Sequence, residues 1–321
     1  MSADIFELLQ KELPGVQKST LLSAHTTFKI GGPAEYFFVA HEQEKILKAI
    51  TLAKELQIPL FIFGGGSNLL VSNKGLKGLV VKINQEVKDF VIEGNTITAS
   101  AGVELQSLVD FSTSHSLKGL EWAGGLPGTL GGAVRGNAGA FGGEIKDVVK
   151  EVQAIDDTFQ LRTFSNHECD FSYRSSIFKK NNWIIIQITL QFQEGVTEEL
   201  EKIANDRRQY RKDKHPLEYP SAGSIFKNVG FETLPREFQN EFADKVKQDP
   251  FPIVPSAWFI IGAGLVGKTI GKAQISEKHS NYIVNLGGAT ASDVLALIKF
   301  AKEAVKEKYE VDLEVEVQYV E

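Results

Sequence analysis

The chain has 321 residues, of which 42% are hydrophobic and 24% are charged, so it is long enough for two or three domains with cores of their own. This composition excludes a disordered, collagen-like or coiled-coil protein as a description of the whole chain. With 35 basic and 41 acidic residues the formal charge is −6. No overall positive field is therefore available to attract nucleic acid or an anionic membrane.

Cysteine content and the N-terminal sequence indicate a compartment. Cys169 is the only cysteine, which excludes an intrachain disulfide and a cysteine-based zinc or iron–sulfur site and fits a reducing environment. Residues 1–15 lack the basic start and apolar centre of a signal peptide, and no apolar run approaches the ~18 residues of a membrane span. Histidines at metal-ligand spacing are absent. We therefore expect a cytoplasmic protein without a metal site.

The first two thirds of the chain mix a few helices with many short strands. Residues 42–57 place apolar side chains at helical spacing, and residues 59–63 predict a buried strand that runs into Gly64-Gly65-Gly66. Further elements are predicted as strands at 78–83, 89–100 (a pair hinged near Gly94), 149–164 and 183–192, and as a helix at 104–117.

A charged, helix-prone segment at 197–214 marks a change in composition and is interpreted as the link to another domain. Thr197 is its predicted N-cap, with acidic residues in the first turn, where they favour the helix dipole. Residues 230–256 carry charges and prolines without steady periodicity, which is typical of an inserted surface loop.

The C-terminal part ends in a helix and a strand. Residues 289–308 form a strongly amphipathic pattern opened by Thr290-x-x-Asp293, a capping signal. Residues 311–319 alternate in polarity, so Leu313, Val315, Val317 and Tyr319 share one face of a predicted strand.

Glycine is the unusual component of the sequence. Nine of the 29 glycines fall between Gly124 and Gly143. Residues without Cβ let the backbone close on a ligand and turn consecutive N–H groups toward an anion. Together with Gly64–Asn68, this tract offers two such loops, as a pyrophosphate would need. Two tight sheet turns would give the same pattern, so both interpretations stay open on these residues alone.

A second glycine pattern, Gly262-x-Gly264-x-x-Gly267, matches the dinucleotide fingerprint and follows a strand-like segment at 258–261. However, another glycine stands where a helix should open, and no second strand ends in an acidic residue about 20 positions later. We favour a glycine-bearing turn.

Several ordered motifs identify a family. Together they resemble the UDP-N-acetylenolpyruvoylglucosamine reductase family, in its compact second type, over most of residues 20–320. The motifs are HTTFKIGGPA from His25, GGGSNLLVS from Gly64, GLPGTLGGAVRGNAGAFGGE from Gly125, FSYRSSIFK from Phe171, YPSAGSIFKN from Tyr219 and AQISEKHSNYIVN from Ala273.

The resemblance implies an α+β protein that uses FAD and NADPH to reduce UDP-N-acetylglucosamine enolpyruvate to UDP-N-acetylmuramate. The FAD-binding fold would be of the vanillyl-alcohol-oxidase (PCMH) type, with subdomains at 1–84 and 85–195. A substrate-binding α+β domain would follow at 205–321, with an insertion near 230–254. A flavin oxidase of sugars or alcohols with the same fold, and a catalytically silent nucleotide-sugar-binding protein, are the alternatives.

The reaction places negative charge on the substrate carboxylate and requires a proton at C2, so a cation and an acid are needed. By resemblance, Arg174 stabilises the enolate, Ser224 donates the proton and Glu316 acts electrostatically or in proton handling. Ser221 is a rival to Ser224. Glu314 is a rival to Glu316, because a proline of the family's ending is missing here.

The resemblance also assigns binding residues. The predicted cofactor-binding residues are Gly64, Gly65, Gly66, Ser67, Asn68, Gly128, Thr129, Gly131, Gly132, Ala133, Asn137 and Gly139. The predicted substrate-binding residues are Tyr173, Lys214, Lys227 and Asn228. The expected partner is a small nucleotide-sugar substrate, with no nucleic acid and no membrane, and the protein is expected to be a monomer. Residues 255–261 and the Arg135-Gly136 pair depart from the family's usual sequence.

Overall fold

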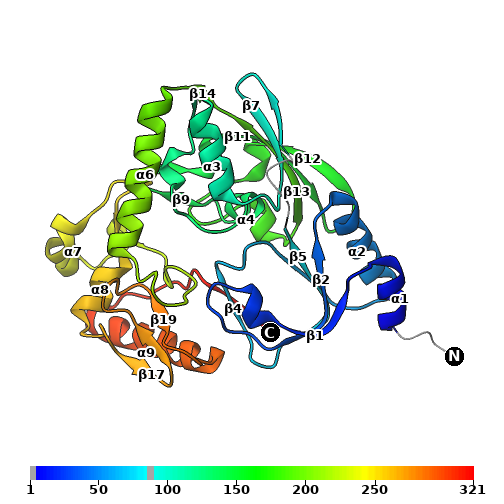
Figure 1. Ribbon diagram of the computed structural model, residues 1–321. Coiled ribbons are helices and arrows are strands. Elements are labelled where there is room, and N and C mark those ends of the chain that lie inside the picture. Colours follow the sequence, from blue (N-terminus) through cyan, green and yellow to red (C-terminus); the bar gives the residue numbers. More distant parts are fainter. Residues whose placement is uncertain (1–4, 85–89) are drawn as a thin grey trace. The chain divides into compact units, whose positions relative to one another are not determined.

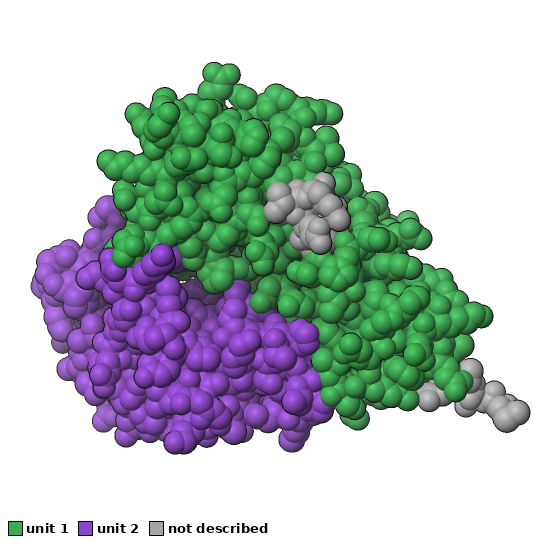
Figure 2. All heavy atoms as spheres, viewed as in Figure 1, with its two compact units in different colours: residues 1–20, 34–65, 77–210 green, residues 21–33, 66–76, 211–321 purple. Residues whose placement is uncertain are grey.

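The structure, a computed structural model, describes residues 5–84 and 90–321. These residues form two compact units, shown in different colours in Figure 2. Unit 1 contains the described residues of 1–20, 34–65 and 77–210, and unit 2 contains 21–33, 66–76 and 211–321.

The compact units divide the chain differently from the three predicted domains. Both predicted FAD-binding subdomains contribute to unit 1, and the expected border between them adjoins residues 85–89, which lie outside the described residues. Segments 21–33 and 66–76 belong to unit 2 because Phe28, Ile30 and Leu70 are buried in its hydrophobic core. Sequence order alone does not reveal that two segments from the N-terminal part of the chain belong to the unit formed mainly by its C-terminal part.

One part of unit 1 is a four-stranded sheet in the order β1-β2-β5-β3, in which β3 and β5 are parallel. Helix α2 packs Ile46 and Ile50 into one core with Leu79 and Val81 of β5. The elements of this part are α1 (Ile5–Glu12), β1 (Gln17–Leu21), β2 (Pro33–Ala40), α2 (Gln43–Glu55), β3 (Leu60–Phe63) and β5 (Leu76–Ile83) (Figure 1).

The other part of unit 1 is a five-stranded antiparallel sheet in the order β12-β11-β13-β7-β6. Its core includes Phe164, which packs against Phe178 and Trp183. The predicted strand at 89–100 is the β6–β7 pair, apart from residue 89, which lies outside the described residues. The elements are β6 (Phe90–Glu93), β7 (Thr96–Ser100), α3 (Leu105–Ser114), α4 (Leu130–Arg135), β11 (Val149–Ile155), β12 (Leu161–Ser165), α5 (Ile177–Lys180) and β13 (Ile184–Gln191).

Two short pairs and a long helix complete this region. The pairs are β8 (Leu117–Lys118) with β14 (Gln193–Glu194), and β9 (Gly139–Ala140) with β10 (Gly143–Glu144). Helix α6 (Thr197–Lys214) has the predicted length. The predicted N-cap is wrong: the Val196 carbonyl accepts the first helical hydrogen bonds, from Glu199 and Leu200, and the Thr197 hydroxyl pairs with Ser116 at 2.8 Å.

Unit 2 contains short strands and three helices. A three-stranded sheet has the order β17-β18-β19, and β20 pairs with β4 in parallel. Thr290 and Asp293 form the predicted capping box of α9. The elements are β4 (Leu69–Val71), β15 (Val229–Gly230), α7 (Arg236–Phe242), β16 (Ile253–Val254), α8 (Ser256–Gly262), β17 (Thr269–Ile270), β18 (Ala273–Ile275), β19 (Ile283–Asn285), α9 (Ala291–Tyr309) and β20 (Gln318–Val320).

Three predictions for unit 2 are corrected. Residues 230–256 are not a surface loop, because they include α7 and the β15–β16 pair and bury Phe242 and Val254 in the core. The strand-like segment 258–261 lies in helix α8. The strand predicted at 311–319 is regular only at β20, and before it Val315 forms an isolated bridge with Phe226. In the second case a short apolar run fits a buried helix as well as a buried strand, and in the third case tertiary contacts override local alternation.

Gly262 is the last residue of α8 and packs against the end of α9. This close packing accounts for a glycine at position 262, so no bound dinucleotide is needed to explain it. A Cβ at this position would lie 1.9 Å from the hydroxyl oxygen of Tyr309, a side chain that is only 1% exposed. Gly264 and Gly267 have φ of +71° and +76°, the left-handed values that favour glycine in turns. The preference for a turn over a dinucleotide fingerprint agrees with this geometry.

We predict that Gly262→Ala destabilises the protein by about 1–3 kcal/mol, because the added methyl group meets the buried Tyr309 hydroxyl. Urea unfolding measures the change. In a Tyr309→Phe background the same substitution should be less harmful, since the nearest atom has been removed. Equal destabilisation in both backgrounds contradicts this explanation.

Candidate functional site

The two glycine loops meet within unit 1. A Cβ on Gly64 would lie 2.2 Å from Thr129 Oγ1, and a Cβ on Gly65 would lie 2.9 Å from the Cα of Gly128. The end of β3 and the loop before α4 therefore pack backbone against backbone, and only glycine fits at these two positions. The two loops that the sequence offers therefore lie in direct contact in the structure.

Helix α4 begins at this contact. Thr129 is its N-cap and accepts a hydrogen bond from the backbone N–H of Gly132 at 3.4 Å. Gly131 is buried with its Cβ position 2.7 Å from the Cβ of Ala101, and Ala133 is 7% exposed. Gly132 is exposed. The short helix is thus packed on one side and presents an exposed, uncharged backbone on the other.

Asn137 has a structural role. Its side chain is fully buried, and its Nδ2 donates to Glu144 Oε1 and to the Ser172 carbonyl, both at 3.1 Å. Its Oδ1 accepts the backbone N–H of Lys146 at 3.3 Å. Asn137 therefore ties the end of α4 to β10 and to the segment that carries Arg174.

Arg174 lies in a tight turn. Ser172 and Ser175 exchange two backbone hydrogen bonds of 3.0 Å, which leaves Tyr173 and Arg174 at the turn's tip. Arg174 has φ of +56°, a left-handed conformation that costs a non-glycine residue about 1–3 kcal/mol. Residues with such strained backbones are enriched at functional sites. Its Nη2 donates to the Gly139 carbonyl at 2.9 Å, and its guanidinium lies 5.1 Å from the centre of the Tyr173 ring.

In unit 2, the segment that carries Ser224 is held on both sides. Asn281 forms a clamp: its Oδ1 accepts the Phe226 N–H at 3.0 Å, and its Nδ2 donates to the Phe226 carbonyl at 2.8 Å. On the other side, the Ile225 carbonyl accepts the N–H of Glu316 at 2.7 Å. Ser224 itself forms a bridge pair with Tyr282.

The two rival glutamates have different surroundings. Glu314 is exposed and forms an ion pair with Lys227 at 2.5 Å. Glu316 is half-buried, and its charge helps to raise the pKa of Tyr282, although burial is the main cause. Glu316 is thus bonded through its backbone to Ile225, the residue after Ser224, whereas the Glu314 carboxylate is paired with Lys227.

The other predicted residues are distributed as follows. Asn68 lies beside Glu316 in unit 2, with its Nδ2 donating to the Glu316 carbonyl at 3.2 Å. Gly66 packs against the His25 carbonyl, and Ser67 adjoins it in the chain. Lys214 is exposed at the end of α6. Asn228 Oδ1 accepts the backbone N–H of Ser256 at 3.2 Å.

Sequence reasoning missed the group formed by Asn281, Tyr282 and His215. Asn281 and Tyr282 lie in the AQISEKHSNYIVN motif, to which the sequence assigns no catalytic or binding residue. The Tyr282 hydroxyl lies 3.0 Å from Nδ1 of His215. Burial lowers the pKa of His215 to about 4 and raises that of Tyr282 to about 12. The only sequence signal for these residues is that Asn281 and Tyr282 lie within a family motif. The contact between Tyr282 and His215 cannot be read from the sequence, because 67 positions separate the two residues.

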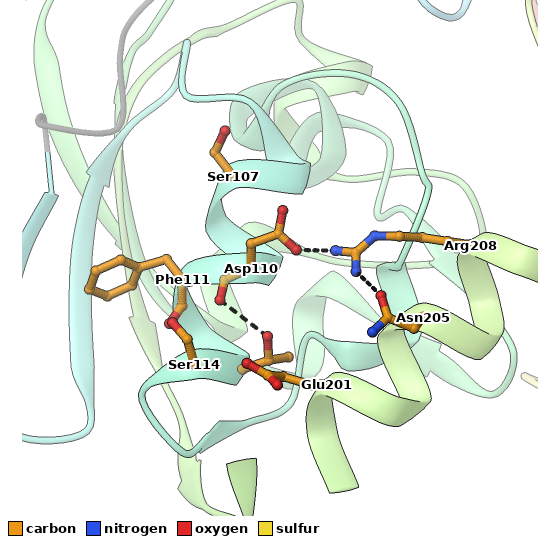
Figure 3. Close-up of a pocket in the computed structure, with 8 residues that line it drawn as sticks. Ser107, Asp110, Phe111, Ser114, Glu201, Asn205 and Arg208 are labelled. Carbon is orange, nitrogen blue, oxygen red and sulfur yellow. Dashed lines mark hydrogen bonds and ion pairs between the residues drawn. The ribbon is translucent and has the colours of Figure 1, made fainter. Parts of the chain in front are cut away.

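A surface pocket lies elsewhere in unit 1, between α3 and α6 (Figure 3). Two of its charged groups satisfy each other: Arg208 pairs with Asp110, and it also donates to Asn205 Oδ1 at 2.8 Å. None of the predicted site residues lines it. We therefore do not interpret this pocket as the active site.

Two absences, judged over residues 5–84 and 90–321, complete the description. No helix there is long and apolar enough to cross a membrane. Within the same ranges, no group of three or more histidine, cysteine, aspartate or glutamate side chains is arranged to hold a metal ion.

Two family models match the chain in the order that the motifs predict. Residues 34–165 match a FAD binding domain, and residues 215–320 match the C-terminal domain of UDP-N-acetylenolpyruvoylglucosamine reductase. The partly exposed glycine backbone of unit 1 fits an anionic dinucleotide, because the contacting loops carry no carboxylate and leave no room for side chains.

Curated relatives span nearly the whole chain. UDP-N-acetylenolpyruvoylglucosamine reductase from Caldanaerobacter subterraneus is 41% identical, over 93% of this chain and 91% of the relative. The protein of the same name from Syntrophomonas wolfei is 38% identical over 100% and 99%. A crystal structure of the reductase from Thermus caldophilus is 29% identical, with a TM-score of 0.74 over 95% of this chain and 99% of that one.

These findings confirm the predicted α+β fold with its FAD-binding domain, and the predicted FAD- and NADPH-dependent reductase of peptidoglycan precursor synthesis. The oxidase and the silent binding protein are correspondingly disfavoured. The chain belongs to the UDP-N-acetylenolpyruvoylglucosamine reductase family.

Proposed function

We propose that Arg174, Ser224 and Glu316 carry the reduction of the enolpyruvyl group in this reductase. FAD, held by the glycine loops of unit 1, would supply the hydride-transfer chemistry, with NADPH as the reductant and C3 of the enolpyruvyl group as the acceptor. The chain's own residues then have two tasks: to stabilise negative charge on the substrate carboxylate and to provide a proton at C2. The local geometry around each residue supports these roles.

Arg174 is suited to the carboxylate. A guanidinium is always charged and offers several N–H groups in a fixed fork. Its backbone is held in the left-handed region by the Ser172–Ser175 turn, and its carbonyl accepts a hydrogen bond from Lys179 Nζ at 3.0 Å. A turn that maintains an unfavourable conformation orients the side chain without a reorganisation step during the reaction.

Ser224 is suited to proton donation. Its O–H bond breaks as the C2–H bond forms, which leaves an alkoxide that neighbours must stabilise or reprotonate. A serine hydroxyl is a weak acid, so its position must be fixed and its surroundings polar. The Asn281 clamp fixes the adjacent backbone, and Glu316 is held to the same segment through the Ile225 carbonyl.

The binding roles extend this proposal. The backbone of Gly64, Gly65, Gly128, Thr129, Gly131, Gly132 and Ala133 would hold the flavin's pyrophosphate, with Asn137 and Gly139 supporting that region and Gly66, Ser67 and Asn68 continuing the first loop. Tyr173, Lys214, Lys227 and Asn228 would contact the nucleotide sugar. A compact ammonium suits a diphosphate. Lys227 would have to bind it in competition with Glu314.

The cellular setting completes the proposal. We place the enzyme in the cytoplasm as a monomer that acts on a soluble nucleotide sugar, contributing to cell shape and division through the cell wall. The acidic net charge and the single cysteine support this setting. Size-exclusion chromatography with light scattering tests the oligomeric state.

We predict that Ser224→Ala leaves anaerobic reduction of the flavin by NADPH nearly intact, but slows reoxidation by the enolpyruvyl nucleotide sugar by about 100-fold or more. Stopped-flow measurement of the flavin absorbance separates the two half-reactions. Ser221→Ala is the matched control and should leave both rates near those of the unsubstituted enzyme. Equal slowing of both half-reactions by Ser224→Ala would show that the proton-donor role is wrong.

The two glutamates should also differ. Glu316→Gln is expected to slow reoxidation by about 10-fold or more, because the charge next to Ser224 is lost. Glu314→Gln removes an exposed ion pair and should change the same rate by less than about threefold. A larger effect of Glu314→Gln would reverse the assignment.

Gly65→Ala should lower the flavin content of the purified protein, because the methyl group separates the loop from Gly128. The ratio of flavin to protein absorbance measures this content. Gly94→Ala is the control: its φ of +58° makes it strained as well, but nothing lies within 4 Å of its Cβ position. Equal flavin loss in both variants would indicate a general loss of stability instead.

A further inference from the structure

Three aromatic rings of unit 2 form a cluster next to Ser224. His215, His279 and Tyr282 lie with ring centres 4.8–5.4 Å apart, mostly edge to face. His215 follows α6, whereas the other two residues lie in the segment that leads into β19. The cluster connects the end of the long helix to the strand that supports Ser224, although none of the proposed chemistry yet uses it.

The hydrogen bond in this cluster joins two uncharged side chains. Because burial lowers the pKa of His215 to about 4, its ring is neutral near pH 7. Because burial raises the pKa of Tyr282 to about 12, its hydroxyl keeps its proton. The Tyr282 hydroxyl and Nδ1 of His215 lie 3.0 Å apart and form a hydrogen bond between two neutral groups, in which the tautomer of the ring decides the donor.

Tyr282 also lies directly opposite Ser224. The backbone N–H of Ile225 donates to the Asn281 carbonyl at 2.8 Å, next to the Ser224–Tyr282 bridge. This arrangement is that of a non-hydrogen-bonded pair, in which facing side chains come closest. The Tyr282 side chain is 8% exposed, so it is a rigid neighbour for the serine.

Charges of the proposed site act on the same phenol. Glu316 raises the pKa of Tyr282 and Arg211, which is 7% exposed, lowers it. The ring is thus hydrogen-bonded to His215 and lies opposite Ser224, and it is subject to the charges of Glu316 and Arg211. Any movement of the ring would change the surroundings of both residues proposed to handle the proton.

We propose that Tyr282, held by its hydrogen bond to His215, is a positioning residue that fixes Ser224 and Glu316 for proton delivery to C2. This inference rests on the proposed roles of Ser224 and Glu316. Tyr282 does not itself exchange a proton with the substrate. Its phenol sets the position of the serine, and His215 sets the position of the phenol.

The test compares variants in the two anaerobic half-reactions. Tyr282→Phe removes the hydroxyl, and His215→Leu removes its hydrogen-bond partner. Each should slow reoxidation by the enolpyruvyl nucleotide sugar about 10- to 100-fold, as expected when a reacting group is displaced by about 1 Å, with reduction by NADPH unchanged within about twofold. The double variant should be no slower than either single variant, because both remove one interaction.

Two further variants separate positioning from structural support. His215→Gln retains an oxygen that can accept the tyrosine hydrogen bond and should recover most of the reoxidation rate. Tyr219→Phe removes the hydroxyl of an exposed tyrosine in the same unit and should change neither rate. The solvent isotope effect on reoxidation should rise in Tyr282→Phe, because proton delivery becomes slower than hydride transfer.

A direct readout of the bond is the nitrogen NMR shift of His215 Nδ1, which should move when Tyr282 is replaced by phenylalanine. An unchanged shift, unchanged reoxidation in Tyr282→Phe, or equal slowing of both half-reactions would each overturn the inference. If Ser224→Ala itself fails to slow reoxidation, the proposed function is wrong. If Ser224→Ala slows it and Tyr282→Phe does not, only the positioning role is wrong.

Discussion

The short segment from Ser224 to Asn228 depends on the side-chain amide of Asn281. This amide accepts from the Phe226 N–H and donates to the Phe226 carbonyl, so it replaces a neighbouring strand at one residue. A buried backbone without such partners would lose about 1–3 kcal/mol for each unsatisfied group. With the amide in place, the other edge of the segment can pair with residues 314–316. The positions of Ser224, Lys227 and Glu316 all follow from this arrangement.

In unit 1 the corresponding constraint is contact between backbones. Gly64 and Gly65 approach Gly128 and Thr129 so closely that a methyl group has no room. The contact removes side chains from the region and leaves peptide groups as the available polar surface. Peptide N–H groups suit a pyrophosphate because they are fixed dipoles that need no counter-charge. A loop built in this way is suited to an anion even though the whole chain is acidic.

The sequence predicted the long, periodic helices well. Helix α6 has the predicted bounds and α9 has the predicted capping box, because local hydrogen bonds and amphipathic spacing determine both. Residues 258–261 were assigned wrongly, since a short apolar run fits a buried helix and a buried strand equally well. The contribution of 21–33 and 66–76 to unit 2 could not be predicted, because it depends on where Phe28, Ile30 and Leu70 find a core.

Tertiary contacts also decide features of the candidate site that the local sequence does not determine. Ordered motifs selected the family and most of the candidate residues, yet alternation placed Glu314 and Glu316 on one face of a strand. In the structure this stretch is irregular, so the two carboxylates have different neighbours. Glu314 meets the Lys227 ammonium in an exposed ion pair. Glu316 acts instead on Tyr282, opposite Ser224. What distinguishes the two residues is therefore the partner that each finds across the segment, and that partner is set by the fold.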